Sequence, residues 1–352
     1  MRIIKRILVF LEIIIIIFSP LLIDNGKKAN AQISLFRQRP VAVDVVLYNF
    51  EDKFISLVRQ SLEDIQKQNP GKVEFKFFDG KGNQAIENEV ISGLVNNEKI
   101  DVLLVNLANT QATQQVIDMV KSKNIPVIFF NREPILIAPI KAYNKSYYVG
   151  TNAKEAGELQ GKILINLWNN DRKLIDKNND GILQYIMLQG ERSSIESQER
   201  TQYSVSAINN AGIKTEQLAL IISNWRSDLA KDAINSLFLQ YGARIEAIIA
   251  NNDEMAIGAI EALQSHGYNQ GDKEKTIPVV GVDATAEAQE LIKKGYMAGT
   301  VIQNPSEMAN AIYEIGLNIF QGDDPLSNTQ YKVDETGVSV RLPYKEYIAN
   351  ET

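Results

Sequence analysis

Oxygen-bearing side chains recur at alternate positions in the stretch Asp176–Gln184. They occupy its first, third, fifth and ninth places, and these residues are Asp176, Asn178, Asp180 and Gln184. Gly181 fills the sixth place, where a sharp turn is needed, and the backbone carbonyl of Ile182 is available at the seventh. A calcium ion takes about six to eight oxygen ligands, which alternate residues of a tight loop can supply. The spacing therefore predicts a calcium site.

The loop is only the first part of an EF-hand. Its twelfth place is Met187, which cannot bind calcium, so a further carboxylate must come from elsewhere in the chain. The segment Gln184–Leu188 is typical of a buried strand rather than of an exiting helix. Judged by spacing alone, the stretch could instead be a polar turn between a helix and a strand that binds no ion.

The N-terminus has the pattern of a secretory signal peptide. Basic residues stand at positions 2, 5 and 6, a mostly apolar run covers residues 7–23, and Ala29-Asn30-Ala31 matches a cleavage site. We therefore predict a signal peptide over residues 1–31, removed after Ala31. A retained membrane anchor is the alternative, because the run approaches spanning length. Either way, we expect the globular part in the periplasm or at the outer face of the cytoplasmic membrane.

Composition excludes several classes of function. The net charge of −6 and the absence of a basic stripe argue against a nucleic-acid partner. The chain has no cysteine, which excludes disulfides, and only one histidine. Zinc sites and histidine-dependent catalytic triads therefore lack most of the side chains that they need. At 352 residues the chain exceeds the usual size of a single core, and two lobes are expected.

Short apolar runs alternate with amphipathic helical stretches from Val41 onward. The strands predicted in the first half are Val41–Tyr48, Val73–Phe78, Val102–Asn106 and Pro126–Phe130. The alternation restarts after Gly150, and the strands predicted there are Leu183–Leu188, Gln217–Ile221, Glu246–Ala250 and Ile277–Val282. Apolar strands separated by helices indicate parallel sheets that are covered on both faces.

The two halves have a similar plan, since residues 124–131 resemble residues 276–283. We therefore predict an α/β fold of two doubly wound, Rossmann-like lobes. No flexible linker separates them, so several short hinge crossings are expected. We assign residues 32–150 plus 303–337 to the N-terminal lobe. The C-terminal lobe then takes residues 151–302 plus 338–352.

Ligands of open α/β sheets bind outside the carboxyl ends of the strands. Polar side chains follow the predicted strands of both halves, and they are Asp52, Asn106, Asn131, the segment Glu191–Arg200, Asn252 and Asp283. Any one of them could simply cap the helix that follows. Together they converge on one cleft, and carboxylates, amides and a guanidinium group suit the hydroxyl rim of a sugar.

A glycine-rich turn offers a competing interpretation. The stretch Gly80–Ala85 fits the spacing of a dinucleotide-binding fingerprint, with Asp101 downstream. However, it follows the second strand rather than the first, and Asp101 begins the next strand instead of ending it. We therefore favour a simple turn.

Several motifs carry a family resemblance. They are Phe129–Pro134, Tyr147–Thr151, Asp176–Gln184, Gly212–Leu218, Ala250–Asp253 and Gly281–Asp283. On these residues the chain resembles the D-galactose/D-glucose-binding proteins of bacterial sugar uptake and chemotaxis, in the type I periplasmic binding protein family. The resemblance implies that family's fold, a monomer, a monosaccharide ligand, an ABC permease as partner, and a chemoreceptor or sensor kinase as a further partner.

The resemblance also assigns roles to individual residues. It implies a rim carboxylate at Asp52 and two rings, Phe54 and Trp225, on the faces of the sugar. Further hydrogen bonds are implied from Asn131, Arg200, Asn252 and Asp283. The resemblance places Glu246 as the distant carboxylate that completes a structural Ca²⁺ site, away from the sugar.

Three positions depart from the family pattern. Ser194 stands where the family has a histidine, Glu196 replaces an aspartate, and Gln303 replaces an asparagine. A serine cannot span the distance that an imidazole covers, and a lost polar contact costs about 1–3 kcal/mol. Galactose or glucose is therefore the leading prediction, with another hexose or a pentose as the alternative.

Two other classes of function are weighed against sugar binding. A repressor-type sensing domain would need an N-terminal helix-turn-helix, where the predicted signal peptide stands instead. A glycosidase would need paired carboxylates such as Asp52 and Asp283, but both match binding positions. We therefore predict no catalytic residues and no enzyme activity.

Overall fold

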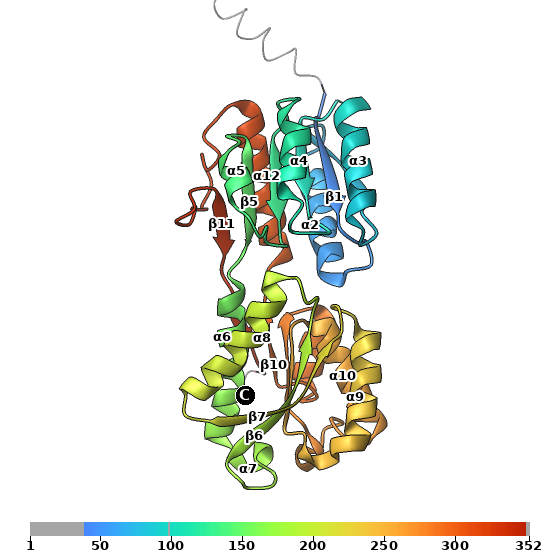
Figure 1. The fold of residues 1–352 in the computed structure, drawn as a ribbon, viewed down its shortest axis with the longest axis vertical. Helices are drawn as coiled ribbons and strands as arrows, with labels where there is room; N and C mark the ends of the chain where they lie inside the picture. The colour runs from blue at the N-terminus through green and yellow to red at the C-terminus, as the bar shows by residue number, and fades with distance from the viewer. Residues whose placement is uncertain (1–38, 98, 350–352) are drawn as a thin grey trace, which may run out of the picture.

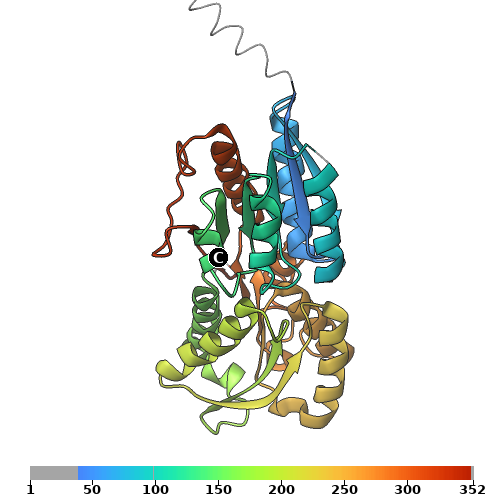
Figure 2. The same ribbon diagram turned by 45° about the horizontal axis from the view of Figure 1, so that its top comes forward.

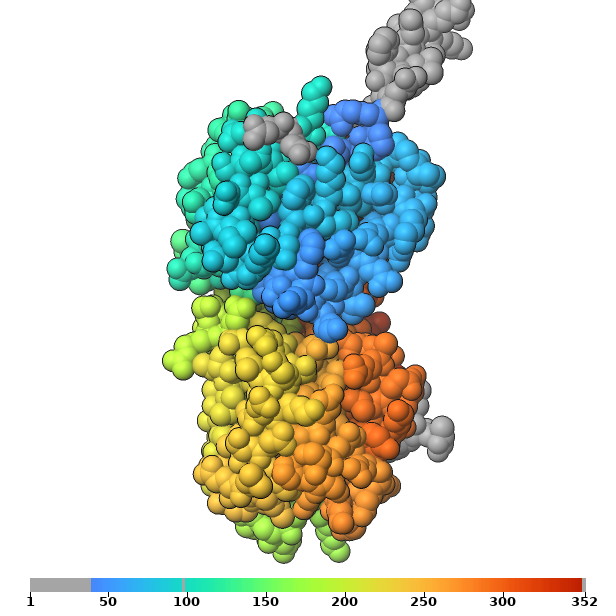
Figure 3. All heavy atoms as spheres, turned by 90° about the vertical axis from the view of Figure 1, so that its right-hand side faces the viewer, coloured from blue at the N-terminus to red at the C-terminus, as the bar shows by residue number. Residues whose placement is uncertain are grey.

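The computed structural model describes residues 39–97 and 99–349, which form two α/β lobes stacked along the long axis (Figure 1). The predicted signal peptide, residues 1–31, lies outside the described residues. Within the described ranges, no helix is long and apolar enough to cross a membrane. A space-filling view shows two masses that meet at a waist (Figure 3).

The N-terminal lobe contains a six-stranded sheet in the order β11-β5-β4-β3-β1-β2. Every neighbouring pair in it is parallel. The strands are β1 (Val41–Leu47), β2 (Val73–Asp79), β3 (Val102–Val105), β4 (Val127–Phe130), β5 (Ser146–Thr151) and β11 (Ser339–Leu342). The central strands β3 and β4 are continuously apolar and buried, as expected for a sheet covered on both faces.

Helices cover both faces of this sheet. They are α2 (Lys53–Gln68), α3 (Gln84–Asn97), α4 (Thr113–Lys121), α5 (Ala138–Lys141) and α12 (Pro305–Gln321). Successive residues of a strand point to opposite faces. Accordingly, Val45 packs in the cluster with α2 and α12, whereas Val46 packs in the cluster with α3, α4 and α5.

The C-terminal lobe has a second six-stranded sheet, in the order β12-β10-β9-β8-β6-β7. Its strands are β6 (Ile182–Gln189), β7 (Lys214–Ile222), β8 (Ala247–Ala250), β9 (Val279–Asp283), β10 (Gly299–Ile302) and β12 (Lys345–Tyr347). Only β12, at one edge, runs antiparallel to its neighbour. The predicted fold class, two similar parallel-sheet lobes, is confirmed.

Two groups of helices enclose the second sheet. One face is covered by α6 (Ala153–Asn170), with α7 (Arg172–Ile175) and α8 (Ile195–Asn210) beside it. The other face is covered by α9 (Ser227–Tyr241), α10 (Asp253–Ser265) and α11 (Ala286–Lys293). Two short 3₁₀ turns, Gly242–Arg244 and Lys273–Lys275, complete this lobe.

The chain passes between the lobes three times (Figure 2). The crossings follow β5, β10 and β11, and they contain Asn152, Gln303-Asn304 and Pro343-Tyr344. The prediction of several short crossings is confirmed. The assignment of residues 338–352 to the C-terminal lobe is wrong for residues 338–342, whereas β12 lies in that lobe as predicted. Strand β11 pairs in parallel with β5 of the N-terminal lobe, so the chain crosses only after Leu342.

The C-terminal lobe includes a close approach between two helices at Gly258 of α10. A Cβ atom added there would clash with the backbone of Ser227, whose carbonyl carbon would lie 2.8 Å away. Backbone cannot move aside as a flexible side chain can, so only glycine fits at this contact. Gly93, in α3, is the opposite case, because nothing lies within 4 Å of its added Cβ.

These two glycines provide a test of the packing. Gly258→Ala should lower the free energy of unfolding by about 1–3 kcal/mol, the usual cost of overpacking. Gly93→Ala should be neutral or stabilising by up to about 1 kcal/mol, because alanine is the better helix former. Urea denaturation measures both, and equal unfolding free energies for the two variants would contradict the packing described here.

Candidate functional site

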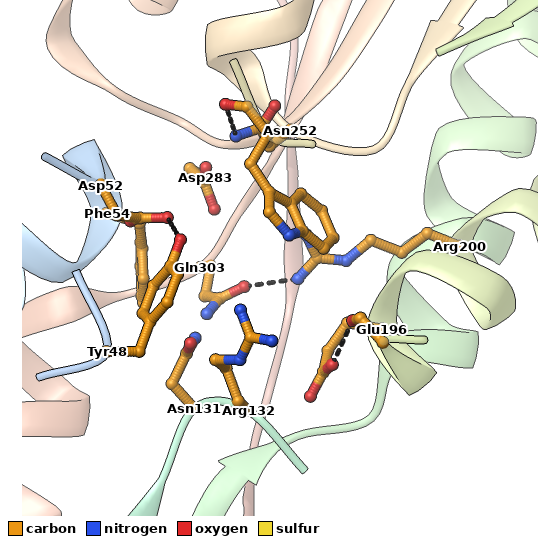
Figure 4. A pocket seen from close by; sticks show the side chains of 12 residues that line it. Tyr48, Asp52, Phe54, Asn131, Arg132, Glu196, Arg200, Asn252, Asp283 and Gln303 are labelled. Carbon is orange, nitrogen blue, oxygen red and sulfur yellow. Dashed lines mark hydrogen bonds between the residues drawn. The ribbon is translucent and has the colours of Figure 1, made fainter. Parts of the chain in front are cut away.

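A small cavity of about 50 Å³ lies between the lobes. Every residue predicted to contact the ligand lines this cavity (Figure 4). These residues are Asp52, Phe54, Asn131, Ser194, Glu196, Arg200, Trp225, Asn252, Asp283 and Gln303.

Sequence reasoning missed two further lining residues, Tyr48 and Arg132. Both lie within two positions of a strand end. Tyr48 was included in the predicted first strand, and Arg132 directly follows the predicted contact residue Asn131, so the same rule of strand ends could have selected both. Conversely, Asn106 is not among the residues that line the cavity. Its buried amide donates to the carbonyl oxygen of Phe130 at 3.0 Å and so joins the ends of two strands.

Asp52 is fixed from two sides by its own lobe. It is the N-cap of α2, where Oδ1 accepts from the backbone N–H of Ile55 at 2.9 Å. Its Oδ2 accepts from the hydroxyl of Tyr48 at 2.6 Å. Burial raises the pKa of Asp52, and the bonds from Tyr48 and Ile55 only partly offset that effect. The carboxylate thus caps a helix and lines the cavity at once.

The C-terminal lobe places its cavity groups in the same way. Ser194 caps α8 and also donates to Oε2 of Glu196 at 2.6 Å. Asn252 caps α10 through Oδ1, while its Nδ2 donates to the backbone carbonyl of Trp225 at 3.2 Å. The same side chains therefore cap helices and line the cavity, so the two roles do not exclude each other.

Arg200 connects the cavity to the crossing segments. Its buried guanidinium donates to Oε1 of Gln303 at 2.7 Å and to the hydroxyl of Tyr344 at 2.8 Å. A third bond, at 2.8 Å, goes to the backbone carbonyl of Asn251. Gln303 and Tyr344 belong to two different crossings, so the geometry of Arg200 depends on the hinge. Figure 4 shows the bond from Arg200 to Gln303.

Three of the ten described non-glycine residues with a positive φ line the cavity. Asn131, Trp225 and Asp283 have φ angles of 62°, 66° and 125°. Non-glycine residues adopt such angles rarely, at a cost of about 1–3 kcal/mol each, and they cluster at ligand sites. The three strained residues therefore support the assignment of this cavity as the functional site.

Asp283 lies beside a second buried carboxyl group. Burial raises the pKa of Asp283, and the negative charge of Asp253 raises it further. Asp253 accepts from the hydroxyl of Thr300 at 2.6 Å and from the backbone N–H of Thr285 at 2.8 Å. Burial also raises the pKa of Asp253, to about 7. Asp253 thus fixes the loop that follows Asp283.

Two aromatic rings from different lobes line the same cavity. Phe54 belongs to α2 of the N-terminal lobe, and Trp225 follows β7 of the C-terminal lobe. Gly190 makes room for the indole, because a Cβ atom at that position would overlap the Trp225 ring. The rings are therefore not confined to separate hydrophobic cores.

The residues of the predicted calcium site also lie together, at the start of β6. Glu246 accepts from the backbone N–H groups of Lys177 at 2.8 Å and Gln184 at 3.1 Å. Asp180 accepts from the side-chain amides of Asn178 at 3.0 Å and Gln184 at 2.8 Å. Ile182, whose carbonyl completes the predicted set, follows directly in β6.

The donor set fits a hard cation in its chemistry. Asp176 is buried and its Oδ1 has no hydrogen-bond partner, which leaves one carboxylate oxygen for a ligand. Across the described parts of the chain, no group of three or more His, Cys, Asp or Glu side chains is arranged to hold a metal. A calcium ion would therefore depend on the amide oxygens of Asn178 and Gln184, whose O and N positions are interchangeable by a flip.

Glu87, a buried carboxyl group of α3, supports the wall of the cavity that the N-terminal lobe provides. Its Oε2 accepts from the backbone N–H of Ala108 at 2.7 Å. The carbonyl oxygen of Ala108 in turn accepts from Arg132 at 3.1 Å. Burial raises the pKa of Glu87 to about 7.

Comparison with known proteins gives consistent matches. A family model described as "Periplasmic binding protein domain" matches residues 42–324. The D-galactose/methyl-galactoside binding periplasmic protein MglB of Haemophilus influenzae is 35% identical over 86% of this chain and 88% of its own length. The ribose import binding protein RbsB of Salmonella typhimurium is 25% identical over 78% and 83%.

Solved structures show the same fold. A solute binding protein of an ABC transporter from Bacillus halodurans, with bound myo-inositol, superposes with a TM-score of 0.71. The match has 23% sequence identity and covers 88% of this chain and 95% of the other. At that identity the likeness concerns the fold.

The raised pKa of Glu87 makes stability depend on pH. The folded protein binds the proton of Glu87 more tightly than the unfolded chain does. The stabilisation by this proton is therefore fully present below pH ~4.5 and is lost as the pH rises through about 7. Glu87→Gln removes that dependence. Between pH ~4.5 and ~7.5, the unfolding free energy of the wild type should fall relative to Glu87→Gln by on the order of 3 kcal/mol.

Urea denaturation at several pH values measures this difference. Glu89→Gln, an exposed carboxylate on the same helix, is the matched control and should track the wild type. A pH-independent difference between the wild type and Glu87→Gln would contradict the proposed titration.

Proposed function

This chain belongs to the periplasmic binding protein family, and we propose that it binds one monosaccharide outside the cytoplasm for an ABC importer. The observation that carries this proposal is the inner cavity between the lobes, which is lined by the predicted contact residues. It combines two aromatic rings with carboxylates, amides and a guanidinium group. The relatives described above are named as binding proteins, and we propose no catalytic activity for this chain.

The chemistry of the cavity suits a sugar ring. A pyranose presents hydroxyl groups around its rim, each a donor and an acceptor, and C–H patches on its faces. Asp52 and Asp283 supply acceptors from opposite lobes, and Arg200 supplies donors. Phe54 and Trp225 supply apolar surface. Closing the lobes around such a ligand excludes water, which strengthens each polar contact.

We propose a galactose- or glucose-like hexose as the leading ligand. The MglB relative supports this choice by its name and by its coverage of the chain. At one end of the cavity, however, both oxygens of Glu196 are already bonded, to Ser194 and to the backbone N–H of Glu133. Because these two oxygens are already bonded within the protein, this chain and MglB could prefer different sugars. Another hexose or a pentose is therefore the second candidate. Chemosensing through a chemoreceptor or sensor kinase would use the surface formed by the closed lobes.

A panel of sugars tests the proposal. Calorimetric titration of the mature chain with galactose, glucose, ribose and myo-inositol should show saturable binding at one site for a hexose. Trp225→Ala should weaken that binding by at least ~10-fold, because covering a sugar face with an indole is worth on the order of 1.5 kcal/mol. Tyr203→Ala, which removes a half-buried ring of α8 that does not line the cavity, is the control and should leave the affinity unchanged. Absence of binding to every sugar, or equal losses in both variants, would reject the assignment.

We also propose a structural calcium ion in the loop Asp176–Gln184. Two observations support it: the orphaned buried oxygen of Asp176 and the convergence of Asp180, Gln184 and Glu246 on one junction. The loop joins α7 to β6, the strand that pairs with both β7 and β8. An ion that binds this loop only in the folded protein would therefore stabilise the C-terminal lobe against unfolding.

Chelation tests the calcium site. The melting temperature of the wild type should fall in chelator, since an ion at ~100 times its Kd contributes about 2.7 kcal/mol to stability. Asp180→Asn should have a lower melting temperature in calcium and no further loss in chelator. Asp232→Asn, an exposed position on α9, should respond to chelator as the wild type does. A wild-type melting curve that is unaffected by chelator would count against the ion.

A further inference from the structure

An ion pair joins the two lobes directly. Arg132 follows β4 of the N-terminal lobe, and Glu191 follows β6 of the C-terminal lobe. Nη1 of Arg132 donates to Oε1 of Glu191 at 3.0 Å, and Nη2 donates to Oε2 at 2.7 Å. Only 9% of the Arg132 side chain and 29% of the Glu191 side chain are exposed. Two parallel bonds between planar groups, shielded from water, form the strong type of ion pair.

The arginine is also anchored within its own lobe. Its guanidinium carbon lies 4.4 Å from the centre of the Tyr48 ring, and Nη2 donates to the carbonyl oxygen of Ala108. Burial by itself lowers the pKa of Arg132, but the hydrogen bonds and charge of Glu191 outweigh burial and hold it above its ordinary value. Arg132 therefore stays charged and requires a counter-charge.

The pair is connected to the ligand cavity. Arg132 stacks on Tyr48, and Tyr48 donates to the Asp52 carboxylate. A continuous set of contacts thus runs from Glu191 of one lobe to Asp52 of the other. On the same side of the cleft, the backbone N–H of Glu133 donates to Glu196 at 2.6 Å, which adds a second bridge between the lobes.

Glu191 occupies a different position from the ligand-contacting residues. It does not line the inner cavity, whereas Arg132 does. It lines an outer cavity that continues from the inner one past Tyr48, Asp52 and Trp225, between the rims of the lobes. Opening of the cleft must separate Glu191 from Arg132, because the two side chains belong to different lobes.

We propose that Glu191 is a positioning residue for ligand binding and acts through Arg132. Pairing across the cleft holds the lobes together before a sugar arrives and keeps Tyr48 and Asp52 in their binding geometry. The apparent affinity of a ligand scales with the fraction of protein already in the competent state. The pair therefore raises sugar affinity without touching the sugar. This inference rests on the proposed function.

Two variants of Glu191 and one control test the inference. Glu191→Gln keeps the shape of the side chain and removes its charge, and Glu191→Ala removes the carboxyl group. Asp228→Asn is the control, because Asp228 lines the same outer cavity but pairs with Arg226 of its own lobe. Small-angle X-ray scattering without and with saturating sugar reports the opening of the cleft, and stopped-flow kinetics report sugar dissociation.

Without sugar, both Glu191 variants should have a larger radius of gyration than the wild type, with the greater increase in Glu191→Ala. With saturating sugar, all proteins should reach the same radius, which shows that the variants fold and close. Glu191→Gln should bind sugar roughly 10-fold more weakly, a change of about 1.4 kcal/mol, mainly through faster dissociation. Asp228→Asn should match the wild type in its radius of gyration, sugar affinity and dissociation rate.

The inference is overturned if the sugar-free radius of Glu191→Ala equals that of the wild type, whatever happens to its affinity. It is also overturned if both Glu191 variants retain wild-type affinity and dissociation rates. Failure of the wild type to bind any sugar would instead contradict the proposed function. The scattering comparison without sugar would then still decide whether the pair holds the lobes together.

Discussion

The structure depends on one geometric constraint: the helices of both lobes begin where parallel strands end, at the interface between the lobes. The side chains that cap these helices are therefore also the side chains that face the cleft. Asp52, Ser194 and Asn252 each bond a backbone N–H of their own helix and line the cavity. Because these groups are already held in place, a ligand does not have to order them on binding, which favours affinity.

The hinge and the cavity are one hydrogen-bonded unit. Arg200 bonds to Gln303 and Tyr344, and these two residues lie in different crossings between the lobes. Tyr344 in turn donates to Gln303 at 3.0 Å and lies 2.7 Å from the hydroxyl of Thr151 at the first crossing. A rotation of one lobe would therefore change the geometry of a cavity residue directly. This linkage gives a physical route by which ligand binding and lobe closure influence each other.

Local patterns in the sequence were enough to predict the lobes and most of the cavity. Apolar runs and helical periodicity locate elements, and the rule that ligands bind at strand ends selects Asp52, Asn131 and Asp283. Contacts between distant segments leave no such pattern. The pair between Arg132 and Glu191 depends on how the lobes meet, and it was not predicted. The sequence does not locate the third crossing for the same reason, since the partner of the short strand β11 is β5, far away in the sequence.

We propose above all that one monosaccharide lies between Phe54 and Trp225 when the lobes close. Trp225 and Trp168 are the two tryptophans of the chain, and Trp168 is buried in the core of the C-terminal lobe. In a Trp168→Phe background, the fluorescence of Trp225 alone therefore reports on the cavity during a sugar titration. The account predicts a saturable change in emission that fits one site and gives the same Kd as calorimetry. Emission that stays constant while calorimetry shows saturation would contradict it.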